Sequence, residues 1–234
     1  NISEVNAQIS GGRRQLSARN RPRSSAMVCA PPSTCWSAET AVPRETLERV
    51  LAGAARSPEG FHPHRKIVKL LADRSEMFLH DRIDWGLGET LAYGSLLLEG
   101  RSVRLSGQDT SRGTFSHRHA ALYDSENGAR HVPLEHLEDG QGPFTLIDTP
   151  LNEAACVGFE YGYSTADPHA LVVWEAQFGD FANVAQVYID QFLASGESKW
   201  QRMSGLVLLL PHGYEGQAPE HSSARHERFL ELSA

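Results

Sequence analysis

The stretch LVLLLPHGYEGQAPEHSSAR, residues 206–225, decides the fold that we predict for this chain. The apolar run before Pro211 is typical of a short strand buried on both faces. The run rich in Ser, Glu and Arg that follows, through Leu230, predicts a helix. Segments at the ends of such strands are held by a rigid scaffold and yet reach solvent. We therefore expect a ligand site here.

Strands and helices alternate along the rest of the chain. Residues 103–105 and 144–147 are candidate strands, and the apolar run at 170–174 predicts another. Residues 182–194 predict a helix before the strand at 206–210. Strands that alternate with helices form a parallel sheet with right-handed crossovers. The predicted fold class is therefore α/β, with a largely parallel sheet flanked by helices.

The first part of the chain has a different composition. Residues 1–42 are rich in Arg, Ser and Pro and show no helical or strand period. We predict a linker or disordered arm there, with a transit peptide as the alternative. Residues 43–83 are predicted to be a connecting helical segment. Its first helix is a short surface helix, indicated by the apolar stripe of Leu47, Val50, Leu51 and Ala54.

Two further helices are indicated by their capping residues. Residues 84–98 predict a helix capped by Asp84. Thr149 is expected to cap another helix, with a proline at its first position and Glu153 in its first turn. A glutamate there has an ordinary explanation, because it complements the helix dipole. Residues 124–142, polar and rich in glycine, predict a surface excursion between the two helices.

Composition limits the class of partner. The 234 residues are 40% hydrophobic, which is enough for a core of ordinary globular size. A formal charge of -7 without a long basic run argues against nucleic acid or an anionic membrane as partner. No apolar stretch approaches the roughly 20 residues of a membrane helix. The three cysteines lack zinc spacing and fit a reducing compartment.

The carboxyl ends of parallel strands meet at one edge of a sheet, which would bring polar and aromatic residues together. The residues so placed are Gln108, Glu153, Glu175, Phe178, Phe181, His212 and His221. Such a set suits an aromatic cofactor with ionisable nitrogens, and it also suits many other ligands. The run RGTFSHRH, residues 112–119, is either a solvated basic loop or a site for a carboxylate or phosphate.

Several long motifs resemble one enzyme family. They are RLSGQDTSRGTF at residues 104–115, GFEYGY at 158–163, WEAQFGDFA at 174–182, LLLPHGYEGQ at 208–217 and PEHSSAR at 219–225. Together they closely resemble the 2-oxoglutarate dehydrogenases, the thiamine-diphosphate-dependent first component of the 2-oxoglutarate dehydrogenase complex. The resemblance covers roughly residues 43–232.

The resemblance implies a domain and an activity. Residues 84–234 would be the pyrimidine-binding domain, incomplete at its C-terminus, whereas magnesium and the diphosphate would be bound by a domain outside this chain. The enzyme would be an obligate homodimer that decarboxylates 2-oxoglutarate and transfers the succinyl group to a lipoyl-lysine of the succinyltransferase component. This piece alone is not expected to catalyse. The compartment would be the bacterial cytoplasm or the mitochondrial matrix.

The resemblance also assigns roles to residues. Glu153 matches the glutamate that bonds a pyrimidine ring nitrogen, and Phe181, with Phe178 nearby, matches the aromatic position that stacks on the pyrimidine. His221 matches a catalytic histidine that faces the substrate. His212 is expected to contact substrate and Gln108 the cofactor. Two further histidines, His117 and His119, are expected to line the pocket.

Departures from the family pattern leave alternatives open. Val184 and Ala218 stand where the family commonly has glycine, and Asn152 stands where serine is usual. A side chain is costly where a positive φ or a close backbone approach is needed. The alternative functions are those of a 2-oxoadipate dehydrogenase, a non-oxidative 2-oxoglutarate decarboxylase, or a non-catalytic scaffold remnant.

Overall fold

The computed structural model describes residues 40–213, 221 and 223–232 of the chain. These residues belong to two compact units. One unit is Val42–Ala224, which holds the sheet and the candidate site. The described part of the other unit includes a short helix, α8 (His226–Leu232).

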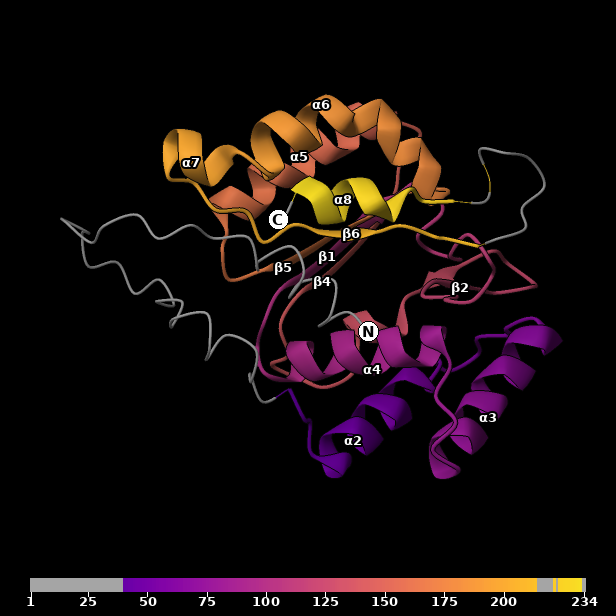
Figure 1. The fold of residues 1–234 in the computed structure, drawn as a ribbon. Helices are drawn as coiled ribbons and strands as arrows, with labels where there is room; N and C mark the ends of the chain where they lie inside the picture. Colours follow the sequence, from indigo (N-terminus) through magenta and orange to yellow (C-terminus); the bar gives the residue numbers. More distant parts are fainter. Residues whose placement is uncertain (1–39, 214–220, 222, 233–234) are drawn as a thin grey trace. The chain divides into compact units, whose positions relative to one another are not determined.

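A parallel sheet forms the centre of the larger unit (Figure 1). Its four strands are ordered β4-β1-β5-β6 and every neighbouring pair is parallel, which confirms the predicted fold class. The strands are β4 (Phe144–Asp148), β1 (Val103–Gly107), β5 (Leu171–Glu175) and β6 (Val207–Leu209). All three residues of β6 are buried, as expected for the run that precedes Pro211.

The register brings the carboxyl ends of the central strands to one level. Gly107 pairs with Asp148 on one side and with Glu175 on the other. A Cβ atom at Gly107 would lie 2.4 Å from the backbone oxygen of Glu175. The strand end therefore requires a residue without a side chain.

Helices cover both faces of the sheet (Figure 1). On one side α4 contacts β1, and α2 packs on α4. On the other side α5 contacts β1 and β5. The helices of the first side are α2 (Arg44–Ala54), α3 (Arg65–Leu79) and α4 (Trp85–Leu98). Those of the second side are α5 (Glu153–Ala166), η2 (Gly179–Ala185), α6 (Gln186–Tyr188), η3 (Ile189–Leu193) and α7 (Gly196–Trp200).

The capping and packing of α4 follow from its sequence. The side chain of Asp84 accepts a hydrogen bond from the backbone N–H of Leu87 at 2.7 Å, which confirms the predicted cap. A Cβ atom at Gly94 would lie 2.2 Å from Val50 of α2, so glycine allows the two helices to pack closely. Because Val50 is fully buried there, α2 belongs to the core and is more than the surface helix that we predicted.

The predicted start of α5 was wrong. The helix begins at Glu153, and its cap is Asn152, whose side chain accepts from the N–H of Ala155 at 2.9 Å. Thr149 still belongs to the sheet edge, because its N–H donates to the carbonyl of Gly107 at 2.8 Å. This bond holds the chain extended, and the helix starts only after it.

Residues 124–142 are not simply a surface excursion. Leu122–Tyr123 (β2) pairs with Arg130–His131 (β3), and the short helix Pro133–Glu135 (η1) follows. The segment then contributes Val132, Leu134 and Leu137 to the hydrophobic core. These apolar residues follow no strand or helix period, which is why the sequence pattern did not reveal them.

Two predicted helices differ in extent. The helix expected at residues 182–194 begins at Gly179 and passes through 3₁₀, α and π turns. Its start is held against the end of β6 because the N–H of Gly179 donates to the carbonyl of Pro211 at 2.9 Å. Of the helix expected after residue 211, the described residues include α8, which starts at His226 after Arg225 with a φ of 50°. In the described part of the chain, no helix has the length and apolarity to span a membrane.

Candidate functional site

The candidate carboxylate, Glu153, lies at the start of α5 and is half-buried. Gln108, directly after β1, donates from its amide to the Glu153 carboxylate at 3.4 Å and to the Leu151 carbonyl at 3.5 Å. The positive end of the helix dipole attracts a carboxylate at this position. The structure thus places two of the predicted site residues in contact.

Phe178, Phe181 and His221 form a cluster of rings. The ring centroids of Phe178 and Phe181 are 6.1 Å apart, and that of His221 lies 4.5 Å from Phe178 and 5.4 Å from Phe181. All three pairs meet edge to face, the geometry that aromatic quadrupoles favour. The three residues are half-buried, so parts of their rings reach the surface.

His212 contacts the backbone beside the ring cluster. Its ring nitrogen Nδ1 accepts a hydrogen bond from the backbone N–H of Ala224 at 2.9 Å. The bond ties the end of β6 to the segment that follows His221. This contact supports the backbone near the ring cluster, and the residue's expected contact with substrate stays a prediction.

The carboxylate and the ring cluster emerge from neighbouring strands. Gln108 follows β1, Glu153 follows β4, and Phe178 and Phe181 follow β5, all at the carboxyl edge of the sheet. The helix α5, which begins with Glu153, packs directly on η2, which contains Phe181. The arrangement joins an anionic group with an aromatic surface at one sheet edge.

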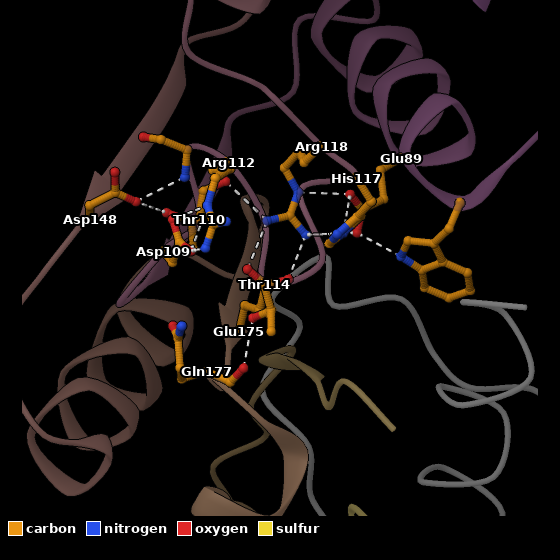
Figure 2. Close-up of polar contacts among 12 residues, drawn as sticks. Glu89, Asp109, Thr110, Arg112, Thr114, His117, Arg118, Asp148, Glu175 and Gln177 are labelled. Atoms are coloured by element: carbon orange, nitrogen blue, oxygen red, sulfur yellow. Dashed lines mark hydrogen bonds and ion pairs between the residues drawn. The ribbon is translucent and has the colours of Figure 1, made fainter. Parts of the chain in front are cut away.

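A buried charge cluster lies beside this edge, and sequence reasoning missed it. The guanidinium of Arg118 lies between the carboxylates of Glu89 and Glu175, with N–O distances of 2.7–2.9 Å (Figure 2). The three side chains are 2%, 2% and 4% exposed. Trp85 also donates to Glu89, at 2.8 Å. The anions held by the basic run at residues 112–119 are therefore carboxylates of the chain itself.

We expected Glu175 to belong to the ligand site, but its carboxylate is buried and bound by Arg118. Burial raises the pKa of Glu175, and its bonds to Arg118 oppose that rise. For Arg118, burial alone would lower the pKa, but the hydrogen bonds to Glu175 and Glu89 raise it above the ordinary value. The signal in the sequence was Glu89, an acidic residue within the apolar helix of residues 85–98.

The pKa values of the two loop histidines are both lowered, which favours the neutral ring. Burial and the neighbouring Arg118 lower the pKa of His117. Burial and the positive charges of Arg74 and Arg112 lower the pKa of His119. The Nε2 atom of His117 lies 3.4 Å from the Arg118 guanidinium, which can only donate, so the ring nitrogen is the acceptor.

Comparison with known proteins identifies the fold family. Residues 81–234 match the family model described as "Transketolase, pyrimidine binding domain". This chain belongs to that family. Among the relatives of this pyrimidine binding domain are proteins named "2-oxoglutarate dehydrogenase E1 component". Those of Brucella ovis and Brucella canis are 57% identical over 197 residues, and that of Brucella melitensis biotype 2 is 56% identical over 197 residues.

The alignment covers 84% of this chain and 20% of each of these relatives. The chain thus spans about a fifth of the length of these relatives. Val184, one of the departures from the family pattern, has an exposed side chain and lies outside the left-handed φ region. It therefore causes no backbone strain of the kind considered from the sequence. Ala218 lies outside the described residues.

Proposed function

We propose that this domain holds the pyrimidine ring of thiamine diphosphate and forms part of a 2-oxoglutarate dehydrogenase. The complete enzyme would decarboxylate 2-oxoglutarate and transfer the succinyl group to a lipoyl-lysine of the succinyltransferase component. The proposal rests on one observation. The Glu153–Gln108 pair and the rings of Phe178, Phe181 and His221 all lie at the same edge of the sheet. The names of the relatives supply the reaction.

The residues fit an aminopyrimidine chemically. A ring nitrogen of that heterocycle can share a proton with a carboxylate, and Glu153 offers one that is half-buried and oriented by Gln108. The half-buried rings of Phe178 and Phe181 offer an apolar aromatic surface for stacking. The chemistry that bound thiamine diphosphate supplies is that of an electron sink for the electron pair released with carbon dioxide.

The chain's own groups would then have distinct tasks. Glu153 would hold a proton at the pyrimidine nitrogen, and Gln108 would orient its carboxylate. Phe181, with Phe178, would exclude water from one face of the ring. His221, which contacts both phenylalanine rings, would contact the 2-oxo acid and exchange a proton there, because an imidazole ring can donate and accept protons.

The complete site would need groups from outside this domain. Magnesium and the diphosphate would be held by another domain. A second copy of the protein would complete the site. The outer face of α5 suits such a contact, since Phe159 is 61% exposed and open space lies over Gly162. The compartment, bacterial cytoplasm or mitochondrial matrix, stays a prediction.

Carbon dioxide release tests the function. The complete gene product, supplied with thiamine diphosphate and magnesium, should release carbon dioxide from 2-oxoglutarate, and Glu153→Gln should reduce the rate at least a hundredfold. A folded protein that binds the coenzyme and yet releases no carbon dioxide would contradict the assignment. Release without succinyl transfer to a lipoyl domain would favour the non-oxidative decarboxylase. Faster turnover of 2-oxoadipate would favour the 2-oxoadipate dehydrogenase.

A further inference from the structure

The loop at residues 108–119 contacts the chain on the carboxylate side of the candidate site. Gln108 at its start donates to Glu153. Next, the hydroxyl of Thr110 and the backbone N–H of Ser111 both donate to the Asp148 carboxylate at 2.8 Å (Figure 2). Burial alone would raise the pKa of Asp148, but these hydrogen bonds lower it, so the carboxylate stays ionised. Asp148 ends β4 and leads the chain towards Glu153.

The same loop contacts the chain on the aromatic side. The hydroxyl of Thr114 donates to the backbone carbonyl of Gln177 at 2.7 Å (Figure 2). The ring of Phe115 lies 6.2 Å from that of Phe178, edge to face. Arg118 then donates to both carboxylate oxygens of Glu175, at 2.8 Å each. These contacts fix the segment that carries the phenylalanine rings of the site.

Internal contacts make the loop rigid. Arg112 forms an ion pair with Asp109 and donates to the hydroxyl of Ser116 at 2.9 Å. The backbone has positive φ at Gly113 and Ser116, 79° and 53°. A Cβ atom at Gly113 would lie 2.5 Å from the His117 ring, so the loop is wrapped closely around that ring.

The far side of the loop is held by two helices. Arg74 of α3, itself buried, donates to the backbone carbonyls of His117 and Arg118 at 2.9 and 2.7 Å. Glu89 of α4 pairs with the Arg118 side chain at 2.7 Å. A rigid loop that is also held by two helices can fix the distance between the two parts of the chain that it contacts, on the carboxylate side and on the aromatic side.

We propose that residues 108–119 act as a spacer that sets the separation between the Glu153 carboxylate and the Phe178 ring, with Arg118 as its main positioning residue. The inference rests on the proposed function, because that separation matters only if one ring system must bond the carboxylate and stack on the aromatic group. Binding constellations of this kind need their groups within roughly 0.5 Å of the productive geometry.

Arg118 carries this task through its geometry as well as its charge. A planar guanidinium presents its N–H groups as a fixed fork that fits two carboxylates, whereas an ammonium is a point charge on a flexible stem. Arg118→Lys therefore keeps the charge balance of the buried cluster and loses the fixed geometry. Thr114→Val is a milder change, which removes only the hydrogen bond to Gln177.

The test measures coenzyme affinity and turnover of the complete gene product. Thiamine diphosphate is titrated with magnesium present, and carbon dioxide release is measured at saturating coenzyme. Arg118→Lys should raise the coenzyme Kd about tenfold to a hundredfold and lower kcat, because a misplacement of about 1 Å can have an effect of that size. Thr114→Val should shift both quantities in the same direction by a smaller factor, about threefold.

Val50→Ala serves as the matched control. Val50 is fully buried where α2 packs on Gly94 of α4, so its truncation should lower stability and leave Kd and kcat unchanged. If Arg118→Lys does not fold, Thr114→Val decides. Unchanged Kd and kcat in the folded loop variants, or an equal change in Val50→Ala, would overturn the spacer. A wild-type protein that fails to bind thiamine diphosphate would instead overturn the proposed function itself, and the spacer with it.

Discussion

Replacing Arg118 by methionine removes the cation that lies between Glu89 and Glu175. Breaking a buried ion pair by removal of one partner costs about 3–5 kcal/mol. Here two carboxylates, 2% and 4% exposed, lose one shared partner, so we expect a loss at the upper end of that range. Since domains of this kind have about 5–15 kcal/mol of stability, the variant should lose a third of it or more.

Urea unfolding followed by tryptophan fluorescence measures the loss, because Trp174 is buried directly before Glu175. With a slope of roughly 2 kcal/mol per molar urea, the midpoint should fall by about 2 M. Arg104→Met is the comparison: Arg104 bonds a single carboxylate, Glu160, at 2.7 and 2.9 Å, and its side chain is 13% exposed. Arg104→Met should therefore lose less free energy of unfolding than Arg118→Met.

The pH dependence provides a second check. Burial already raises the pKa of Glu175, and without Arg118 the pKa should rise further. When the pKa of a carboxyl is higher in the folded protein than in the unfolded chain, the protein becomes more stable as the pH falls towards the unfolded-state pKa. The deficit of Arg118→Met should therefore shrink between pH 7 and pH 5. A loss below about 1 kcal/mol, or a deficit that does not shrink, would refute the reasoning.

Three other predictions concern stability, each measured by the same urea titration. Gly107→Ala should destabilise the protein by about 1–3 kcal/mol, because the new Cβ atom would lie 2.4 Å from a backbone oxygen. Gly162→Ala should stabilise it by about 0.5–1 kcal/mol, because the new Cβ atom would have no atom within 4 Å. Asn152→Ala should cost about 1 kcal/mol through loss of the α5 cap. The lowered pKa of His117 means that the unfolded chain binds more protons, so stability should rise with pH up to about 6.5, and His117→Gln should weaken that dependence.

Each of these predictions has a contradicting outcome. Equal effects of alanine at Gly107 and Gly162 would show that the strand end tolerates a side chain. An unchanged midpoint for Asn152→Ala would show that the α5 start is held by other contacts. A wild-type pH profile in His117→Gln would show that the buried ring does not contribute.

Much of the fold could be predicted because several of its strands are short runs rich in apolar residues. Residues 144–147 and 170–174 read as buried strands, and the structure contains them with bounds that differ by one residue. The start of α5 could not be predicted, because Thr149 and Asn152 are both good caps. A hydrogen bond across the sheet, from the Thr149 N–H to Gly107, decided between them.

The candidate site was partly predictable for a similar reason. Residues that directly follow strands lie at one sheet edge, and this rule brought Gln108 to Glu153 and Phe178 to Phe181. The rule misjudged Glu175, because the fate of its carboxylate depends on a partner that no local pattern indicates. Periodicity reports which face a residue occupies, and it does not report which distant side chain will neutralise its charge.

The contacts of residues 108–119 join parts of the chain that are far apart in sequence. Arg118 and Glu175 are 57 positions apart, and Thr114 and Gln177 are 63 positions apart. Contacts of such long sequence separation form late, because the entropy of closing the intervening loops opposes them. The pairing of β1 with β5, as between Val103 and Leu171, joins residues of similarly long separation and belongs to the same stage of folding. The proposed coenzyme site would therefore be complete only after this stage, and coenzyme binding would report that folding is complete.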